Sequence, residues 1–301
     1  MDTLERCCPN LSSVALRQIC CGTKNLPRLK SLLRRCPGIR RLCLEWSIRN
    51  VEWHGELGFI IDCLADVQVL ALKGRHTLVS RDLLRLASHH CNLQALSLSE
   101  WYGPDQWRVQ PEAIAALLQH CPRLVALRLR NINVGLRASA VPVCLALRHV
   151  ELCDIDGDLT GFVSALAVAA GATLRYLGLE ACRVRDSALK AVATHCDALL
   201  QLDLTNALSL TDAGLWYLHR QVATTTNTAI IPGTIYPCPS LAKLNITLDS
   251  EVGDRVILSP FSSAAIASLV SARPALKIND MDERTPLHCF EELVHLVDHD
   301  S

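Results

Sequence analysis

The residues best suited to chemistry in this chain are three histidine–cysteine pairs and a histidine-rich C-terminal segment. Imidazole and thiolate groups are ligands that zinc prefers, and the pairs are His90-Cys91, His120-Cys121 and His195-Cys196. Each pair stands at the end of a short helical pattern, where a histidine interacts with the helix C-terminus. A structural zinc site usually needs four convergent ligands, so these pairs predict no metal site.

The C-terminal segment places four ligand-type residues on one face of a helix, at spacings i, i+3, i+7 and i+11. They are His288, Glu291, His295 and His299. The polar face of an amphipathic helix explains this set without a metal, and we expect none.

The sequence carries no motif for catalysis or cofactor binding. It contains no Gly-rich phosphate loop, no G-x-S-x-G, no H-E-x-x-H and no C-x-x-C. Lys and Arg number 30 and so do Asp and Glu, so no net charge favours nucleic acid or an anionic membrane. No apolar run reaches the length of a membrane span, and residues 1–6 lack the start of a signal peptide. We expect a non-enzymatic cytoplasmic chain, with the nucleus as an alternative.

The elements that position every side chain come from a repeated leucine pattern. Leu174, Leu177, Leu179 and Cys182 form L-x-x-L-x-L-x-x-C, and a second copy begins at Leu199, as in leucine-rich repeats. Strand side chains alternate, so these leucines share one face, and one unit cannot bury that face without its neighbours. The first leucine-type positions are Leu11, Ile39, Val67, Leu93, Leu124, Leu147, Leu174, Leu199 and Leu241, with a degenerate one at Leu276.

This spacing predicts an α/β leucine-rich-repeat solenoid. We expect a right-handed horseshoe with parallel strands on its concave face and helices on its convex face, and a single domain over 1–301 with about nine to ten repeats. Residues 221–239 are Thr-rich and contain Pro232, Gly233 and Pro237, which indicates a surface insertion. Residues 279–301 contain an amphipathic pattern that we expect to form a helical cap on the final layer.

Cysteine recurs at one position of the repeat. Cys8, Cys36, Cys121, Cys144, Cys196 and Cys238 each lie three residues before a first leucine-type position. A free cysteine behaves as a small buried hydrophobe, and the chain contains 15 cysteines, an odd number. We therefore expect reduced thiols with a packing role, rather than a disulfide framework.

The amino-acid sequence of the repeats indicates a particular repeat subtype, which their period alone does not. The phrases V-R-D-S-A-L-K-A-V-A-T-H-C-D-A-L-L-Q-L-D-L and L-S-L-T-D-A-G-L, with C-P-x-L openings at Cys8, Cys121 and Cys238, resemble the cysteine-containing repeats of F-box/leucine-rich-repeat (FBXL-type) proteins. The resemblance implies that the repeats recognise substrates of an SCF-type ubiquitin ligase. It also implies a Skp-type adaptor and a cullin as further partners, although no F-box motif precedes the first repeat. A leucine-rich-repeat scaffold or inhibitor unconnected with ubiquitination is the alternative.

Strand residues between the leucines predict where a protein partner would bind on the concave face. The proposed centre consists of Arg128, Arg130, His149, Glu151, Tyr176, Glu180 and Asp203. Neighbouring strands lie about 4.8 Å apart, so Arg128 and Arg130 are expected to reach Glu151, either within a solvated face of local ion pairs or facing a charged partner. An aromatic loop with Trp101, Tyr102 and Trp107 either covers the next helix or adds partner contacts.

Overall fold

The structure is a computed structural model and describes most of the chain. The described residues are 10–19, 25–46, 57–74, 80–99, 108–134, 136–141, 146–219, 238–246, 250–252, 255–257, 259–279 and 290–298. The predicted insertion at 221–239, except for its last two residues, and the aromatic loop at 101–107 lie outside them. None of the helices within the described ranges is long and apolar enough to span a bilayer.

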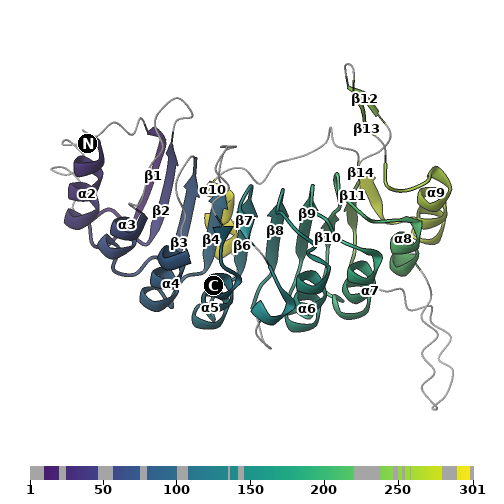
Figure 1. The fold of residues 1–301 in the computed structure, drawn as a ribbon, viewed down its shortest axis with the longest axis horizontal. Helices are drawn as coiled ribbons and strands as arrows, with labels where there is room; N and C mark the ends of the chain where they lie inside the picture. The colour runs from purple at the N-terminus through teal and green to yellow at the C-terminus, as the bar shows by residue number, and fades with distance from the viewer. Residues whose placement is uncertain are drawn as a thin grey trace, which may run out of the picture.

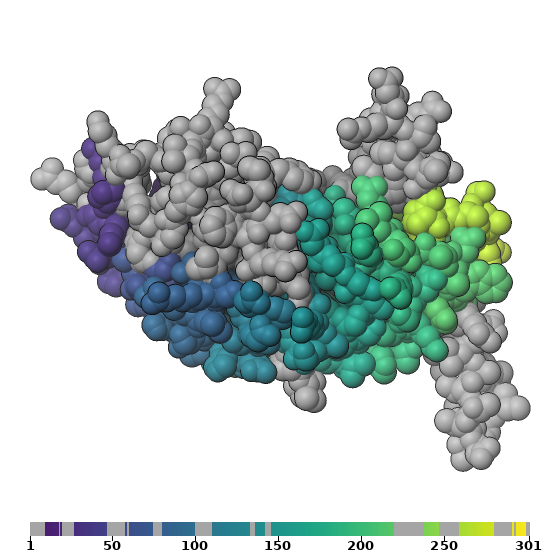
Figure 2. Space-filling view, in the orientation of Figure 1, coloured from purple at the N-terminus to yellow at the C-terminus, as the bar shows by residue number. Residues whose placement is uncertain are grey.

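The chain is a leucine-rich-repeat solenoid, as the leucine pattern predicted. Ten parallel strands form one open sheet in the order β1-β2-β3-β4-β6-β8-β9-β10-β11-β14 (Figure 1). The strands are β1 (Ser13–Ile19), β2 (Arg41–Trp46), β3 (Val69–Lys73), β4 (Ala95–Ser99), β6 (Ala126–Arg130), β8 (His149–Cys153), β9 (Tyr176–Glu180), β10 (Gln201–Asp203), β11 (Lys243–Asn245) and β14 (Lys277–Asn279). Figure 2 shows the layers following one another in chain order along the long axis.

Helices follow the strands and cover one face of the sheet. They are α2 (Asn25–Arg35), α3 (Leu57–Cys63), α4 (Ser80–His89), α5 (Pro111–His120), α6 (Thr160–Ala170), α7 (Asp186–His195), α8 (Asp212–His219) and α9 (Ser263–Ala272), with the 3-10 helix η1 (Ala138–Ala140) between β6 and β8. Two small sheets pair β5 (Arg108–Val109) with β7 (Asn133–Val134), and β12 (Ser250–Val252) with β13 (Arg255–Ile257). The second pair lies inside the long interval between Leu241 and Leu276. The sheet face opposite the helices is the concave face.

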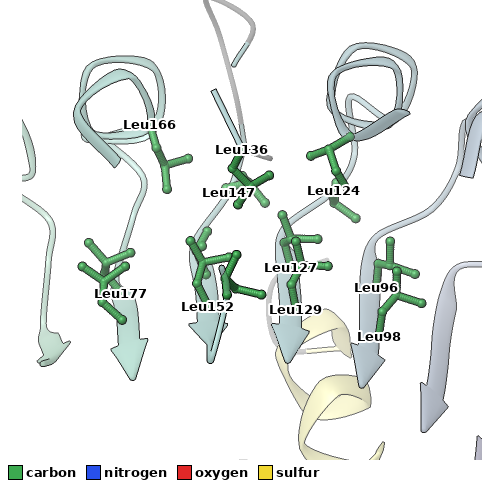
Figure 3. Close-up of a cluster of buried hydrophobic side chains, with 14 of the residues drawn as sticks. Leu96, Leu98, Leu124, Leu127, Leu129, Leu136, Leu147, Leu152, Leu166 and Leu177 are labelled. Carbon is green, nitrogen blue, oxygen red and sulfur yellow. The ribbon is translucent and has the colours of Figure 1, made fainter. Parts of the chain in front are cut away.

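The core consists of leucine rows that run from strand to strand. Leu70 of β3 pairs with Leu96, which pairs with Leu127, and two residues later Leu72, Leu98 and Leu129 repeat the same register. All of these side chains are buried, and those of Leu96, Leu98, Leu127 and Leu129 lie on the helix side of the sheet (Figure 3). Each buried leucine contributes about 1.5–3 kcal/mol, so the repeated row stabilises every layer through its neighbours.

Helix starts are tied to one another between layers. In four layers, the first helical residue accepts a hydrogen bond from the backbone N–H just before the next helix. Ser80 Oγ accepts from Gln110 at 2.8 Å, Thr160 Oγ1 from Arg185 at 3.0 Å, Asp186 Oδ1 from Thr211 at 2.9 Å and Asp212 Oδ1 from Ser262 at 2.7 Å. These bonds satisfy backbone donors that precede each helix and fix the spacing of neighbouring helices.

Each strand of the middle layers is followed directly by a residue with a left-handed backbone. Asn131, Asp154 and Ala181 all have φ of 52°, and their N–H groups donate to the next layer, to the carbonyls of Cys153, Glu180 and Thr205 at 2.9 Å. Asparagine and aspartate tolerate this conformation, whereas alanine is strained in it because its Cβ approaches the following carbonyl.

We expect the substitution Ala181→Gly to raise the free energy of unfolding by about 0.5–1 kcal/mol. It removes a strain of about 1–2 kcal/mol, and the larger entropy of glycine in the unfolded chain offsets part of the gain. Urea unfolding measures the change. The control is Ala172→Gly, an exposed residue outside the left-handed region, which should lose about 0.5–1 kcal/mol. A loss of stability at both positions would contradict the strain.

The repeated cysteine position is a close contact between layers. Cys36, Cys121, Cys196 and Cys238 are buried free thiols, and burial raises the pKa of Cys121 to about 11 and of Cys238 to about 12. The Sγ of Cys121 donates to the His90 carbonyl of the preceding layer at 3.5 Å. The packing role predicted for this position therefore holds at these four residues, while Cys8 and Cys144 lie outside the described ranges.

The C-terminal helix is not a cap on the final layer, and that prediction was wrong. Helix α10 (Phe290–Asp298) lies on the concave face, where it contacts β3, β4 and β6 (Figure 1). Leu293 and Val297 share a buried cluster with Val69, Ala71, Ala95, Ala126 and Cys43. Small apolar side chains on the concave face of these strands provide the surface that the apolar face of α10 needs.

Candidate functional site

The concave face consists of side-chain rows whose register is fixed by strand pairing. The row at the strand starts is Arg41, Val69, Ala95, Ala126, His149, Tyr176, Gln201, Lys243 and Lys277. Two residues later, the central row is Cys43, Ala71, Ser97, Arg128, Glu151, Gly178, Asp203, Asn245 and Asn279. The first half of both rows is mostly small and apolar, whereas the second half is polar.

Arg128 and Glu151 form a buried ion pair at the centre of this face. Arg128 Nε donates to Glu151 Oε2 at 2.8 Å, and the two side chains are only 7% and 10% exposed. Burial by itself would raise the pKa of Glu151, but the nearby His149 side chain and the charges of Arg128 and Arg130 lower it. The pairing of Arg128 with Glu151 across one strand step was predicted, and the structure confirms it.

Arg130 does not take the predicted partner. Its Nη2 donates to Glu180 Oε2 at 2.8 Å, two strands away, and passes over Cys153, which occupies the position between them in the register. The short cysteine side chain leaves room for the long arginine to reach β9. Burial raises the pKa of the Cys153 thiol, and the charge of Glu180 adds to the effect.

His149 and Tyr176 lie side by side on β8 and β9 as stacked rings. Their centroids are 4.2 Å apart and their planes differ by 4°, and His149 Nε2 lies 3.9 Å from Glu151 Oε2. Tyr176 lies over Gly178, where a Cβ would come within 3.0 Å of the tyrosine hydroxyl. Glycine at that position therefore lets the tyrosine lie flat across the row.

Asp203 is the acceptor of a separate hydrogen-bond network. Its Oδ1 accepts from the Thr205 N–H at 3.0 Å and from Thr205 Oγ1 at 2.6 Å, and its Oδ2 accepts from Asn245 Nδ2 at 2.9 Å. Asn279 continues the network to Asn245 at 3.4 Å. Asn245 and Asn279 were not among the predicted site residues, although a polar residue at the same strand position in successive repeats was the available signal.

The structure therefore places the seven predicted residues on consecutive strands. The sequence did not predict that several of them would be buried in contacts within the sheet. Arg128, His149, Glu151 and Asp203 are buried and interact with one another or with neighbouring strands. Arg130, Tyr176 and Glu180 are half-buried. The buried members hold the sheet in register, so their part in binding a partner remains a prediction. The loop residues Trp101, Tyr102 and Trp107 lie outside the described part of the chain.

The more accessible polar side chains lie at the C-terminal end of the first row. Gln201 and Lys243 are half-buried and Lys277 is exposed, and Lys243 and Lys277 stand directly opposite each other on β11 and β14. Within the described residues, neither lysine has an ion-pair partner. Like charges in this position repel, so a carboxylate placed over the pair would relieve that repulsion.

The histidines that resembled metal ligands have other roles where the structure describes them. His120 Nδ1 lies 2.8 Å from the Ala116 carbonyl of its own helix, and His90 Nε2 lies 3.2 Å from the Ile61 carbonyl of the preceding layer. Glu291 pairs with Arg17, while His288 and His299 lie outside the described residues. Among the described residues, no three His, Cys, Asp or Glu side chains are placed to hold a metal ion.

No protein-family model matches this chain, and no curated protein matches it. Among solved structures, a chain in the crystal structure of the Rad7 and Elc1 complex in yeast overlaps it with a TM-score of 0.49 and 17% sequence identity. The overlap covers 92% of this chain and 73% of that chain. A likeness at this level assigns no partner or activity.

Proposed function

We propose that this chain is a non-enzymatic protein-recognition module of the cytoplasm or nucleus that binds its partner along the concave face. Its more specific role is the substrate-binding part of an SCF-type ubiquitin ligase receptor, with a Skp-type adaptor and a cullin as further partners. The resemblance of the repeats to those of F-box/leucine-rich-repeat proteins supports the ligase role, and the accessible end of the sheet supports the recognition role.

The observation that carries the recognition role is the row Tyr176, Gln201, Lys243 and Lys277. These side chains come from four adjacent strands in one register, so they present a flat, ordered series of polar groups at strand spacing. The two neighbouring lysines favour a partner that places carboxylates over β11 and β14, because complementary charge fixes register and accelerates association.

Charge reversal of this lysine pair is expected to abolish partner capture. The tagged chain is used for affinity capture from native cells, with mass spectrometry of the co-purified proteins, in the wild type, in Lys243→Glu/Lys277→Glu and in a matched control, Arg34→Glu/Arg81→Glu. The control reverses two exposed charges on α2 and α4, on the other face of the sheet. We expect at least about a tenfold loss of partner in the lysine variant and none in the control.

The co-purified proteins also test the ligase role. A Skp-type adaptor and a cullin that co-purify with the wild type and with both variants would support it, since the lysine pair should affect the substrate alone. One stoichiometric protein without ligase subunits would favour the scaffold or inhibitor alternative. Equal capture of the partner by the lysine variant and the control would show that the lysine pair is not part of the binding site.

A further inference from the structure

The concave face contains an apolar patch where the rest of the face is polar. In the first row, β3, β4 and β6 contribute Val69, Ala95 and Ala126, and in the second row β2 and β3 contribute Cys43 and Ala71. The same rows carry His149, Glu151 and Asp203 in later strands. Small side chains leave a shallow surface that allows another element to approach the sheet closely, and α10 covers this patch.

Helix α10 shows which kind of structural element packs against this patch. Leu293 and Val297 are 2% and 5% exposed against it, and this i, i+4 pair is the anchor arrangement of an amphipathic helix bound in a groove. Val294 and Leu296 pack beside them. Figure 3 shows the helix, in yellow, crossing the sheet on the side opposite the leucine core.

Charged residues at the two ends of α10 fix its direction across the sheet. Glu291 accepts two hydrogen bonds from Arg17 Nη2, at 2.7 and 2.8 Å, and Asp298 pairs with Arg41. Arg41 opens β2, whereas Arg17 lies in the second half of β1, so α10 runs antiparallel to the strands. An acidic residue at a helix C-terminus opposes the helix dipole, so Asp298 gains its stabilisation from Arg41 rather than from the helix.

The attachment of α10 through its described side chains is small in extent. A helix of nine residues is too short to be stable alone in water, so it depends on the patch. Of its described side chains, Leu293 and Val297 are buried, and the Arg17–Glu291 pair is exposed, with side chains 52% and 62% accessible, and therefore contributes little. Such a contact holds mainly because the helix is tethered to the sheet, which gives it a high effective concentration.

We propose that the patch of Cys43, Val69, Ala71, Ala95 and Ala126 is a helix-binding surface, and that α10 occupies it as an internal competitor of a partner helix. The partner segment is an amphipathic helix with two apolar residues at i, i+4 and an acidic residue near each end, for Arg17 and Arg41. This inference rests on the proposed function in one respect, because it takes the natural partner to be a protein. Binding of the partner releases α10 from the concave face.

A peptide exchange experiment on the full chain tests the surface. The probe is a fluorescently labelled synthetic peptide of residues 287–301 with Cys289→Ser, and fluorescence polarisation measures its binding to the wild type, to Leu293→Asp and to the control His295→Asp. Leu293 is buried, whereas His295 is exposed on the same helix. We expect the Leu293→Asp chain to bind the peptide at least about tenfold more tightly than the other two, because its own helix no longer competes.

Equal affinity of the three chains would overturn the competition, and no saturable binding to Leu293→Asp up to about 1 mM peptide would overturn the helix-binding surface. If circular dichroism shows that Leu293→Asp is unfolded, Glu291→Arg/Asp298→Arg replaces it, since both residues are exposed. A peptide that itself carries Leu293→Asp should not bind any of the chains. The exchange reports on the patch alone and partner capture reports on Lys243 and Lys277, so either result can fail without the other.

Discussion

The substitution Glu151→Ala is expected to lower the free energy of unfolding by about 3–5 kcal/mol, because it leaves the buried charge of Arg128 without its partner. Chemical denaturation followed by circular dichroism measures the loss. The matched control replaces both partners, as Arg128→Met/Glu151→Leu, and should cost much less, since no uncompensated charge then remains. If the double variant loses as much as the single one, packing and not the charge of Arg128 determines the effect.

The same residue predicts a pH dependence. The pKa of Glu151 is lowered in the folded chain, so the stability that its ionised form contributes is complete above the unfolded pKa of about 4.3 and is lost as the pH falls through the folded pKa. The wild type should therefore lose stability on acidification more steeply than Arg128→Met/Glu151→Leu. Parallel acid denaturation curves for the two proteins would contradict a lowered pKa.

The substitution Gly171→Ala is expected to destabilise the chain by about 3 kcal/mol or more. Gly171 stands at the repeat position that cysteine occupies in other layers, and a Cβ there would lie 2.2 Å from the His195 carbonyl oxygen and 2.3 Å from that of Ala167. Both atoms belong to the backbone, so helices α6 and α7 would have to move apart, and overpacking of this kind costs about 1–3 kcal/mol or more. Thermal and urea unfolding measure the loss.

Gly161, in helix α6, gives a control of opposite sign. A Cβ at Gly161 would meet only the Cβ of Ala138, at an ordinary 3.7 Å. Gly161→Ala should therefore raise stability by about 0.5–1 kcal/mol, because alanine loses less backbone entropy in a helix. If the two substitutions change stability by the same amount, the close approach of α6 and α7 does not explain why position 171 needs glycine.

The buried pair also changes how the concave face should be probed. Reversal of Arg128 and Arg130 would place like charges beside Glu151 and Glu180 inside the sheet, so loss of a partner in that variant would report unfolding as readily as binding. Lys243 and Lys277 support no such internal pair in the described residues. They are therefore the better positions at which to separate recognition from folding.

The sequence by itself determined the repeating layer. Leucines two residues apart, followed by a helical pattern, predicted the parallel strands, the helices and the buried leucine rows, because strand and helix periodicity depend on neighbours a few residues away. The cysteine position was also readable, since a residue that recurs once per layer meets the same surroundings each time.

Only the tertiary structure decided which side chains meet on the concave face. Arg130 passes over Cys153 to Glu180. Glu291 and Asp298 of α10 pair with Arg17 and Arg41, which are 274 and 257 residues away in the sequence. The repeat pattern could not assign these contacts, because it specifies the register of adjacent strands and not the segment that covers them. Apolar residues at the concave positions Val69, Ala71, Ala95 and Ala126 were the one local signal, since a strand with both faces apolar must be covered on both.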